Sequence, residues 1–285
     1  MDNTALATQD TKQIFMKCGA CSHTYFYVLN REFGHPKEPE ELASDPLAGG
    51  LMHGQQCGML WGASLAAGAE SFRRNANQDQ AIGAAITTTR QLMESFSERA
   101  KSVNCRDVVG VDFSDKFGIV KFILKALLHG GIKNSTCFNL AEKWTPEAIQ
   151  TAREGLSRPQ TDIVQQPINC AAEVARKMGA SDEEMVMVAG FAGGMGLSGN
   201  ACGALGASIW MNTLTWLRNH PGEIPPSFNQ KNTARIFEAF DAATGSEILC
   251  HKIAGQNFKT IDEHTEFIRN GGCKDLINVL TQEAI

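Results

Sequence analysis

The chain carries the same set of cysteines twice, and this internal repeat constrains its fold more than any other feature of the sequence. Cys57 and Cys105 are 48 residues apart, and so are Cys202 and Cys250. The two pairs share neighbours: a glycine follows the first cysteine, an arginine lies 15 residues before the second, and glycine and phenylalanine lie five and eight residues after it. A repeat of about half the chain predicts two similar structural units.

The register of the repeat also sets the expected domain boundaries. The last cysteine of each half, Cys137 or Cys273, is followed by Glu-Ala-Ile at the same distance. We therefore expect a first repeat at residues 1–149 and a second repeat at residues 167–285. Residues 150–166 contain glycine, proline and many polar side chains, which is typical of a linker.

Composition indicates a globular protein and the compartment in which its thiols would work. Of the 285 residues, 43% are hydrophobic and 20% are charged, which suffices for a buried core in each half. A net charge of −5 provides no basic surface, so we expect no nucleic-acid partner. The polar start of the chain lacks the apolar segment of a secretory signal, and nine cysteines without export indicate a cytoplasmic protein whose thiols bind metal or do redox work.

Two long uncharged segments raise the question of a membrane span. Pro46 to Ala69 and Met185 to Leu217 are both long enough to cross a bilayer. The second contains seven glycines, and both contain polar side chains that would need partners in lipid. Buried glycine-rich loops between core helices explain these segments better, so we expect no membrane span.

The sequence predicts an all-α fold. Ser181 and Glu184 form a capping-box pattern at the start of a helix, and residues 87–101 and 233–243 have the apolar spacing of amphipathic helices. Runs that alternate with period two are scarce, so no sheet is expected. We expect two similar helical bundles packed about a pseudo-twofold axis.

Cys57 and Cys202 are the candidate catalytic residues. Each follows a glycine turn and opens a predicted helix, where free backbone N–H groups favour a thiolate, so both are expected to be unusually acidic thiols. The alternative for any single Cys-Gly pair is a small buried cysteine in a tight helix crossing. Four glycines beside these cysteines would let a cofactor, a sulfur atom or another backbone approach closely: Gly54, Gly58, Gly199 and Gly203.

The segment from Cys57 to Gly62 resembles the Cys-Gly-Ala-x-x-Gly motif of the C-GCAxxG-C-C family of redox-active proteins, and the segment from Cys202 is similar. Met59 replaces the alanine of the motif in the first half, and Gly206 arrives one residue early in the second. The resemblance implies a tandem member with redox-active cysteines, one before and two after each motif. The two implied sets are Cys21, Cys57, Cys105 and Cys137, and Cys170, Cys202, Cys250 and Cys273.

Several chemistries fit four thiols in each half. An iron–sulfur cluster takes about four thiolates, a structural zinc site uses tetrahedral thiolate ligands, and metal-free thiol–disulfide exchange needs one attacking and one resolving thiol. The first half adds Cys18, which with Cys21 makes either a redox dithiol or two adjacent metal ligands. The segment from Cys18 to His23 misses the haem-attachment motif by one residue. The candidate metal ligands are therefore all nine cysteines: Cys18, Cys21, Cys57, Cys105, Cys137, Cys170, Cys202, Cys250 and Cys273.

The leading hypothesis is a redox protein that holds an iron–sulfur or related metal centre on thiolates of each repeat. It would transfer electrons or carry out redox chemistry on a small molecule. A metal-free thiol–disulfide oxidoreductase is the second hypothesis, and a zinc-stabilised binding or scaffold protein is the third. The expected partner is a redox protein or a small-molecule substrate, and a homo-oligomer is compatible with the sequence.

Overall fold

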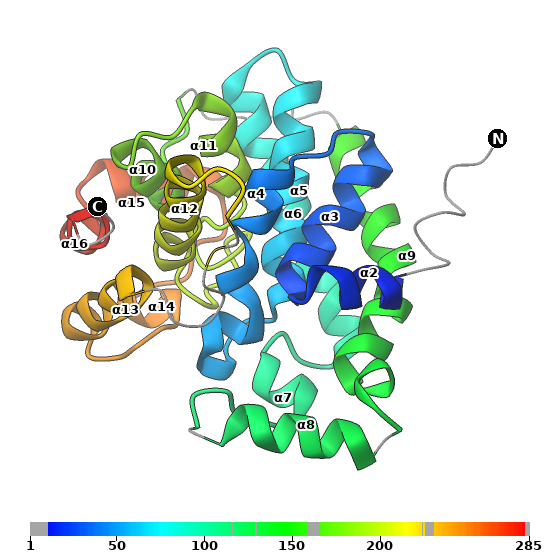
Figure 1. Cartoon of the computed structure of the whole chain (residues 1–285). Coiled ribbons are helices and arrows are strands. Elements are labelled where there is room, and N and C mark those ends of the chain that lie inside the picture. The colour runs from blue at the N-terminus through cyan, green and yellow to red at the C-terminus, as the bar shows by residue number, and fades with distance from the viewer. Residues whose placement is uncertain are drawn as a thin grey trace.

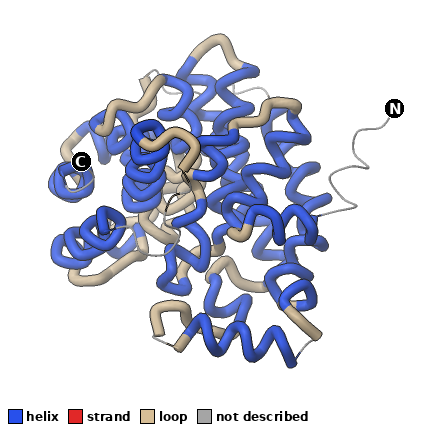
Figure 2. Tube along the Cα trace, viewed as in Figure 1, coloured by secondary structure: helices blue, strands red, loops and turns tan. Residues whose placement is uncertain are grey.

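The computed structural model describes residues 11–115, 117–128, 130–158, 166–223, 225 and 231–282. Over these residues the protein is built of helices and loops and contains no β-strand, which confirms the all-α prediction (Figures 1 and 2).

The first repeat consists of helices that gather around a central antiparallel pair, α5 and α6. Its α-helices are α2 (Thr11–Cys18), α3 (Cys21–Phe33), α4 (Glu38–Leu42), α5 (Gly58–Arg74), α6 (Gln78–Ala100), α7 (Cys105–Val109), α8 (Gly118–Leu128) and α9 (Thr136–Ser157). Its other turns are the 3₁₀ helices η1 (Asp45–Leu47) and η3 (Ile132–Asn134) and the π-helical turn η2 (Gly50–Gly54).

The second repeat begins after the segment that the structure leaves undescribed at residues 159–165. Its helices are α10 (Cys170–Lys177), α11 (Asp182–Ala189), α12 (Gly203–Asn219), α13 (Lys231–Thr244), α14 (Cys250–Ile253), α15 (Ile261–Arg269) and α16 (Lys274–Gln282). The predicted capping box is present at the start of α11, where Ser181 and Glu184 bond each other's backbone N–H groups.

The structure differs from the expected linker in one respect. Helix α9 continues to Ser157, so residues 150–157 of the expected linker are helical. Ala152 and Leu156 of this segment are buried, which explains the longer helix: the apolar face of α9 continues past the end of the first repeat. Residues 159–165 lie outside the described residues.

The duplication is visible in the backbone itself. Gln56 pairs with Asn104 in an isolated antiparallel β-bridge, and Ala201 pairs with Leu249 in the same way. Both residues of the second pair lie 145 positions after their counterparts in the first. The two halves therefore repeat a backbone contact as well as a set of residue types.

The two repeats share one hydrophobic core. Helix α5 of the first repeat crosses α11 of the second at Gly68, where an added Cβ would lie 2.5 Å from the Cα atom of Met187. Trp61 of α5 packs edge-to-face on Phe191, with 4.6 Å between ring centres. One contiguous cluster of buried side chains contains residues of both repeats. The two halves therefore pack around a common core.

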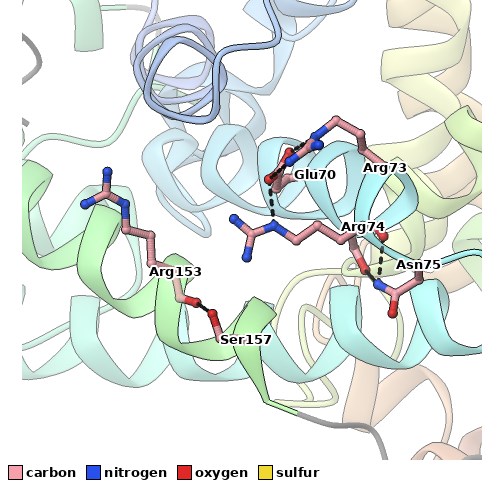
Figure 3. A network of polar contacts seen from close by, with 7 residues as sticks. Glu70, Arg73, Arg74, Asn75, Arg153 and Ser157 are labelled. Atoms are coloured by element: carbon pink, nitrogen blue, oxygen red, sulfur yellow. Dashed lines mark hydrogen bonds and ion pairs between the residues drawn. The ribbon is translucent and has the colours of Figure 1, made fainter. Parts of the chain in front are cut away.

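The end of α5 carries an ion cluster around one buried carboxylate (Figure 3). The carboxylate of Glu70 is buried, and it accepts hydrogen bonds from Arg73 and Arg74, each with an N–O distance of 2.6 Å. A buried charge is tolerated when it is paired and hydrogen bonded in this way. The two arginines lie in the last turn of α5, where they also offset the negative end of the helix dipole.

Helix α8 presents an unusual amount of apolar surface for a surface helix. Most of its length is Ile, Val, Phe, Leu and Ala, and Leu124, Leu127 and Leu128 are 56%, 61% and 86% exposed. It lies at the edge of the first repeat beside α7 (Figure 1). Within the described ranges, no helix combines the length and the apolar character that a bilayer crossing requires.

Candidate functional site

The eight repeated cysteines all lie at or beside the start of a helix. Cys21, Cys105, Cys170 and Cys250 are the first residues of α3, α7, α10 and α14. Cys57 and Cys202 are the N-cap residues of α5 and α12, Cys137 is the second residue of α9, and Cys273 directly precedes α16. Free backbone N–H groups at helix starts favour negatively charged sulfur, so the sequence repeat is a repeat of potential thiolate positions.

A pair of backbone hydrogen bonds holds Cys57 beside Cys105 in the first repeat. The N–H of Cys57 donates to the carbonyl of Val103 at 2.7 Å, and the N–H of Cys105 donates to the carbonyl of Gln55 at 2.6 Å. The starts of α5 and α7 are thereby tied together, although they are far apart in the sequence.

The second repeat uses the same two hydrogen bonds. The N–H of Cys202 donates to the carbonyl of Ile248 at 2.9 Å, and the N–H of Cys250 donates to the carbonyl of Asn200 at 2.7 Å. Within each repeat, neighbouring cysteines help to raise one another's pKa, so cysteines that are distant in the sequence are gathered into two clusters. All nine cysteines are free thiols.

In the first cluster, Cys21 and Cys57 form a hydrogen-bonded pair of thiols with opposite properties. The S–H of Cys57 donates to the sulfur of Cys21, and this bond lowers the pKa of Cys21 in spite of its burial. Backbone N–H groups of Gly49, Ser22 and Cys21 itself lower the pKa further. The same thiol–thiol bond, together with burial, raises the pKa of Cys57 well above its usual value.

This finding corrects the expectation that Cys57 and Cys202 are the acidic thiols. Burial, followed by the charge of Cys170, raises the pKa of Cys202 to about 12. Both residues are N-caps, but at Cys57 the hydrogen bond with Cys21 and then burial raise the pKa, and at Cys202 burial outweighs the backbone N–H groups of Leu205 and Ala204. In the first repeat the thiol whose pKa is lowered is Cys21 instead.

The remaining thiols are held neutral, mainly by burial. Burial raises the pKa of Cys105 and, to about 12, that of Cys137. In the second repeat burial raises the pKa of Cys170 and Cys250, and that of Cys273 to about 12. The first repeat thus contains an acidic thiol, whereas the four thiols of the second repeat all resist ionisation.

Of the two candidate glycines that directly follow Cys57 and Cys202, one lies against a thiol and the other against a backbone carbonyl. A Cβ added at Gly58 would lie 2.5 Å from the Sγ atom of Cys21, so this glycine makes room for the acidic sulfur. A Cβ added at Gly203 would lie 1.9 Å from the carbonyl oxygen of Phe191, which is a backbone crossing.

The other two glycines occupy equivalent turns. Gly54 and Gly199 have φ angles of +66° and +73°, which favour glycine. A Cβ at Gly54 would lie 3.0 Å from the Cβ of Arg106, and one at Gly199 would lie 3.1 Å from the Cβ of His251. Both turns therefore pack against the residue that follows the second cysteine of the repeat.

A cavity of about 540 Å³ opens above the first thiol cluster. Cys21, Cys105 and Cys137 contribute to its lining, and the other walls are mainly apolar. These walls come from the end of α2, η2, the loop before α8, α8 itself, η3 and the start of α9: Phe15, Met16, Met52, Phe113, Ile119, Phe122, Ile123, Ile132 and Phe138. The cavity gives an apolar molecule access to the acidic sulfur of Cys21.

Cys18, the unpaired cysteine of the sequence, does not line this cavity. It ends α2, is half-buried, and its thiol hydrogen bonds to the imidazole of His23. The Nδ1 atom of His23 lies 3.0 Å from Oδ1 of Asp45. Sequence reasoning missed this role of His23 and missed Asp45 altogether, and the only sequence signal was the short interval between Cys18 and His23.

In the part of the chain that the structure describes, the thiols are not grouped in threes as metal ligands would be. Among the residues that the structure describes, no three His, Cys, Asp or Glu side chains are positioned to hold one metal ion together. The iron–sulfur, zinc and haem assignments stay predictions.

The fold and the site together define a class: an all-α protein with two tandem thiol clusters at helix starts. The family model described as "Putative redox-active protein (C_GCAxxG_C_C)" matches residues 20–144 and 168–284. The two matches cover most of the chain, so the chain belongs to this family as a tandem duplicated member. Comparisons with curated proteins and with solved structures gave no match.

Proposed function

We propose that this redox-active protein works by thiol–disulfide exchange, with Cys21 as the attacking thiol and Cys57 as the resolving thiol. The observation that carries this proposal is the hydrogen bond from Cys57 to Cys21, which leaves one acidic and one neutral thiol in contact. A dithiol needs this asymmetry because the attacking sulfur must be a thiolate while its partner stays protonated until it is used.

The chemistry balances as a two-electron exchange. The Cys21 thiolate attacks one sulfur of a substrate disulfide, the substrate S–S bond breaks, and the first substrate thiolate leaves and takes up a proton. Cys57 then loses its proton and attacks the Cys21 sulfur, which forms the Cys21–Cys57 disulfide and releases the second substrate thiol. An external dithiol reductant, either a partner protein or a small molecule, returns the pair to its reduced form.

The cavity supports an apolar substrate. Cys21 lines it whereas Cys57 does not, so the attacking sulfur faces the entering molecule and the resolving sulfur lies behind it. An apolar wall excludes water and favours a disulfide whose flanking groups are hydrocarbon or aromatic. The raised pKa values of Cys105 and Cys137 keep the two neighbouring thiols from competing for the substrate.

The second repeat acts as a scaffold in this proposal. All its cluster thiols have raised pKa values, and its helices complete the core on which α5 packs. Nine free thiols in one chain also fit a reducing compartment such as the cytoplasm.

The test is an equilibrium redox titration of the full chain, followed by alkylation and peptide mapping. We expect the thiols of Cys21 and Cys57 to disappear together, because they form one disulfide. The peptides that contain them should then be recovered as a linked pair, before the thiols of the second repeat oxidise. The variant Cys57→Ser should instead accumulate a mixed disulfide on Cys21. Oxidation that begins in the second repeat, or that leaves Cys21 and Cys57 reduced, would contradict the proposal.

The metal hypothesis has a separate readout. Protein purified without oxygen can be analysed for iron, zinc and acid-labile sulfide. Stoichiometric iron and sulfide with visible absorbance would favour the iron–sulfur centre and electron transfer over thiol exchange. Stoichiometric zinc without absorbance, and unfolding by chelators, would favour the scaffold hypothesis.

A further inference from the structure

The exposed apolar side chains of the protein are gathered in one place. Among the residues that the structure describes, every exposed large apolar side chain lies within residues 117–128 or is Met16 or Ile132. Met16 and Ile132 line the cavity over the first thiol cluster, together with residues of α8. We call these exposed side chains the α8 face. Apolar surface that is concentrated in this way marks an interaction site, whereas single exposed apolar side chains are ordinary.

Helix α8 is attached to the rest of the protein along one side only. Ala126 is 2% exposed, and the ring of Phe122 lies 5.7 Å from that of Phe113. Successive residues of an α-helix are about 100° apart, so Leu124 and Leu128 fall on the side opposite Ala126. In Figure 1, α8 is the outermost helix of the first repeat at the bottom of the view. The helix therefore has a second apolar side that packing onto the protein does not use.

The segment that carries the α8 face is basic, although the protein is acidic. Residues 116–133 contain four lysines and neither Asp nor Glu, whereas the whole chain has a net charge of −5. Lys121 and Lys133 are exposed, and Lys121 also forms an ion pair with Asp115. Apolar side chains accompanied by lysines match a bilayer that contains anionic lipid, because the apolar groups enter the hydrocarbon boundary while the ammonium groups reach the headgroups.

A second copy of the chain fits the α8 face less well than a bilayer does. It would bring two lysine-rich segments into one contact, where their like charges repel. It would also cover the cavity, because Met16, Ile119, Ile123 and Ile132 belong to the face and line the cavity as well. A bilayer instead leaves the cavity beside hydrocarbon, in which apolar molecules dissolve.

We propose that the α8 face docks on the surface of a membrane that contains anionic lipid. Helix α8 has 11 residues, which suffices to lie in the interface but not to cross a bilayer, for which roughly 20 are needed. In this orientation the cavity opens toward the lipid, so lipid-soluble molecules reach the first thiol cluster without passing through water. The docking does not require Cys21 and Cys57 to be a redox pair.

The test is co-sedimentation of the full chain with vesicles of phosphatidylcholine alone or of equal parts phosphatidylcholine and phosphatidylglycerol. Binding to the anionic vesicles should be at least about tenfold stronger. The double variant Leu124→Gln/Leu127→Gln should weaken this binding at least about tenfold, because it removes two apolar side chains from the face. Both positions are exposed, so its circular dichroism should match the wild type. No binding to either kind of vesicle, or equal binding of the wild type and this variant, would overturn the proposal.

A matched pair of charge variants separates the α8 face from the rest of the surface. Lys121→Gln/Lys133→Gln should weaken binding to the anionic vesicles about tenfold, because it removes two charges from the lysine-rich segment. Lys177→Gln/Lys274→Gln removes the same charge from exposed positions of the second repeat and should leave binding unchanged. Equal weakening in both variants would mean that overall charge governs binding, which would contradict docking through this face.

Analytical ultracentrifugation without vesicles tests the second copy as the occupant. A dimer that Leu124→Gln/Leu127→Gln abolishes, together with absent vesicle binding, would assign the α8 face to self-association and overturn the proposal. The redox titration of Cys21 and Cys57 is carried out without lipid, so a failure of docking and a failure of the redox pair are told apart.

Discussion

The indole ring of Trp61 in the first repeat occupies the space where a side chain at Gly206 of the second repeat would lie. A Cβ at Gly206 would be 2.5 Å from the Cζ3 atom of the indole, and Trp61 is fully buried. Gly206 stands one residue earlier than the corresponding glycine of the family motif. At this position α12 makes room for the tryptophan of α5. This contact joins the two repeats into one core.

Gly206→Ala should therefore destabilise the whole chain. A methyl group would force the indole to shift in a closely packed core, and we expect a loss of about 1–3 kcal/mol in the free energy of unfolding. Urea denaturation of the wild type and the variant measures it. In the double variant with Trp61→Phe the two effects should be less than additive, and full additivity would contradict the contact.

The sequence predicted the thiol clusters because their spacing repeats, and a repeated spacing requires a repeated backbone. The equivalent β-bridges Gln56–Asn104 and Ala201–Leu249 show that the backbone contact repeats with the same spacing. The pattern could not reveal which thiol has a lowered pKa, since Cys57 and Cys202 have the same local sequence of glycine turn and helix start. The answer depends on burial and on contacts from distant elements, such as the Gly49 N–H that bonds Cys21.

The pairing of His23 with Asp45 lay beyond sequence reasoning for a similar reason. The two residues are on different helices, neither has a counterpart in the second repeat, and no motif spacing links them. The fold class was easier to predict because helical periodicity is a local property. The shared core could not be predicted, because the apolar faces of α5 and α11 do not show that these two helices pack on each other.

Gly58→Ala tests the close approach of the acidic sulfur. The added Cβ would lie 2.5 Å from Sγ of Cys21, so the sulfur must move and its hydrogen bond with Cys57 should weaken. We expect disulfide formation between Cys21 and Cys57 to slow about tenfold, in line with about 1.4 kcal/mol for a displaced reacting group. Rates follow from timed alkylation and peptide mapping. The matched substitution Gly203→Ala should instead lower stability without affecting this rate in the folded fraction.

Glu70→Gln should destabilise the protein in a pH-dependent way. Burial works to raise the pKa of Glu70, but the hydrogen bonds from Arg73 and Arg74 prevail and lower it. The folded carboxyl group therefore binds its proton less tightly than in the unfolded chain. Its contribution is present above the unfolded pKa of about 4.5 and is lost as the pH falls through the lower folded value.

We expect the glutamine variant to lose about 1–3 kcal/mol at pH 7, because the buried carboxylate loses its charge-assisted hydrogen bonds from Arg73 and Arg74. Urea denaturation between pH 3.5 and pH 7 should show the two stabilities converging at the acidic end. Glu173→Gln, which breaks the more exposed pair with Arg176, is the control and should cost less than about 0.5 kcal/mol. Parallel stability curves for Glu70→Gln and the wild type would contradict the assignment.

His264 should make the chain sensitive to mild acid. Burial lowers its pKa to about 4, and its ring packs edge-to-face on Phe258 with 4.8 Å between centres. In this pH range the His264 imidazole binds a proton in the unfolded chain but not in the folded chain. The free energy of unfolding therefore falls as the pH drops from about 6.5 toward 4. Between pH 7 and pH 5 the wild type should lose about 2 kcal/mol more than His264→Phe. Equal losses in the two proteins would show that the ring is protonated as easily in the folded state.

The cavity over Cys21 can be tested with two neighbouring residues of α8. Ile123 lines the cavity, whereas Leu124 is 56% exposed and does not. An amide in the wall would disfavour an apolar molecule, so Ile123→Gln should slow the reaction of Cys21 with N-phenylmaleimide about fivefold, which corresponds to about 1 kcal/mol. Leu124→Gln removes a similar apolar side chain from the same helix without touching the wall, and its labelling rate should match the wild type. Equal slowing in both variants would mean that the reagent is attracted by the apolar surface of α8 as a whole rather than by the cavity.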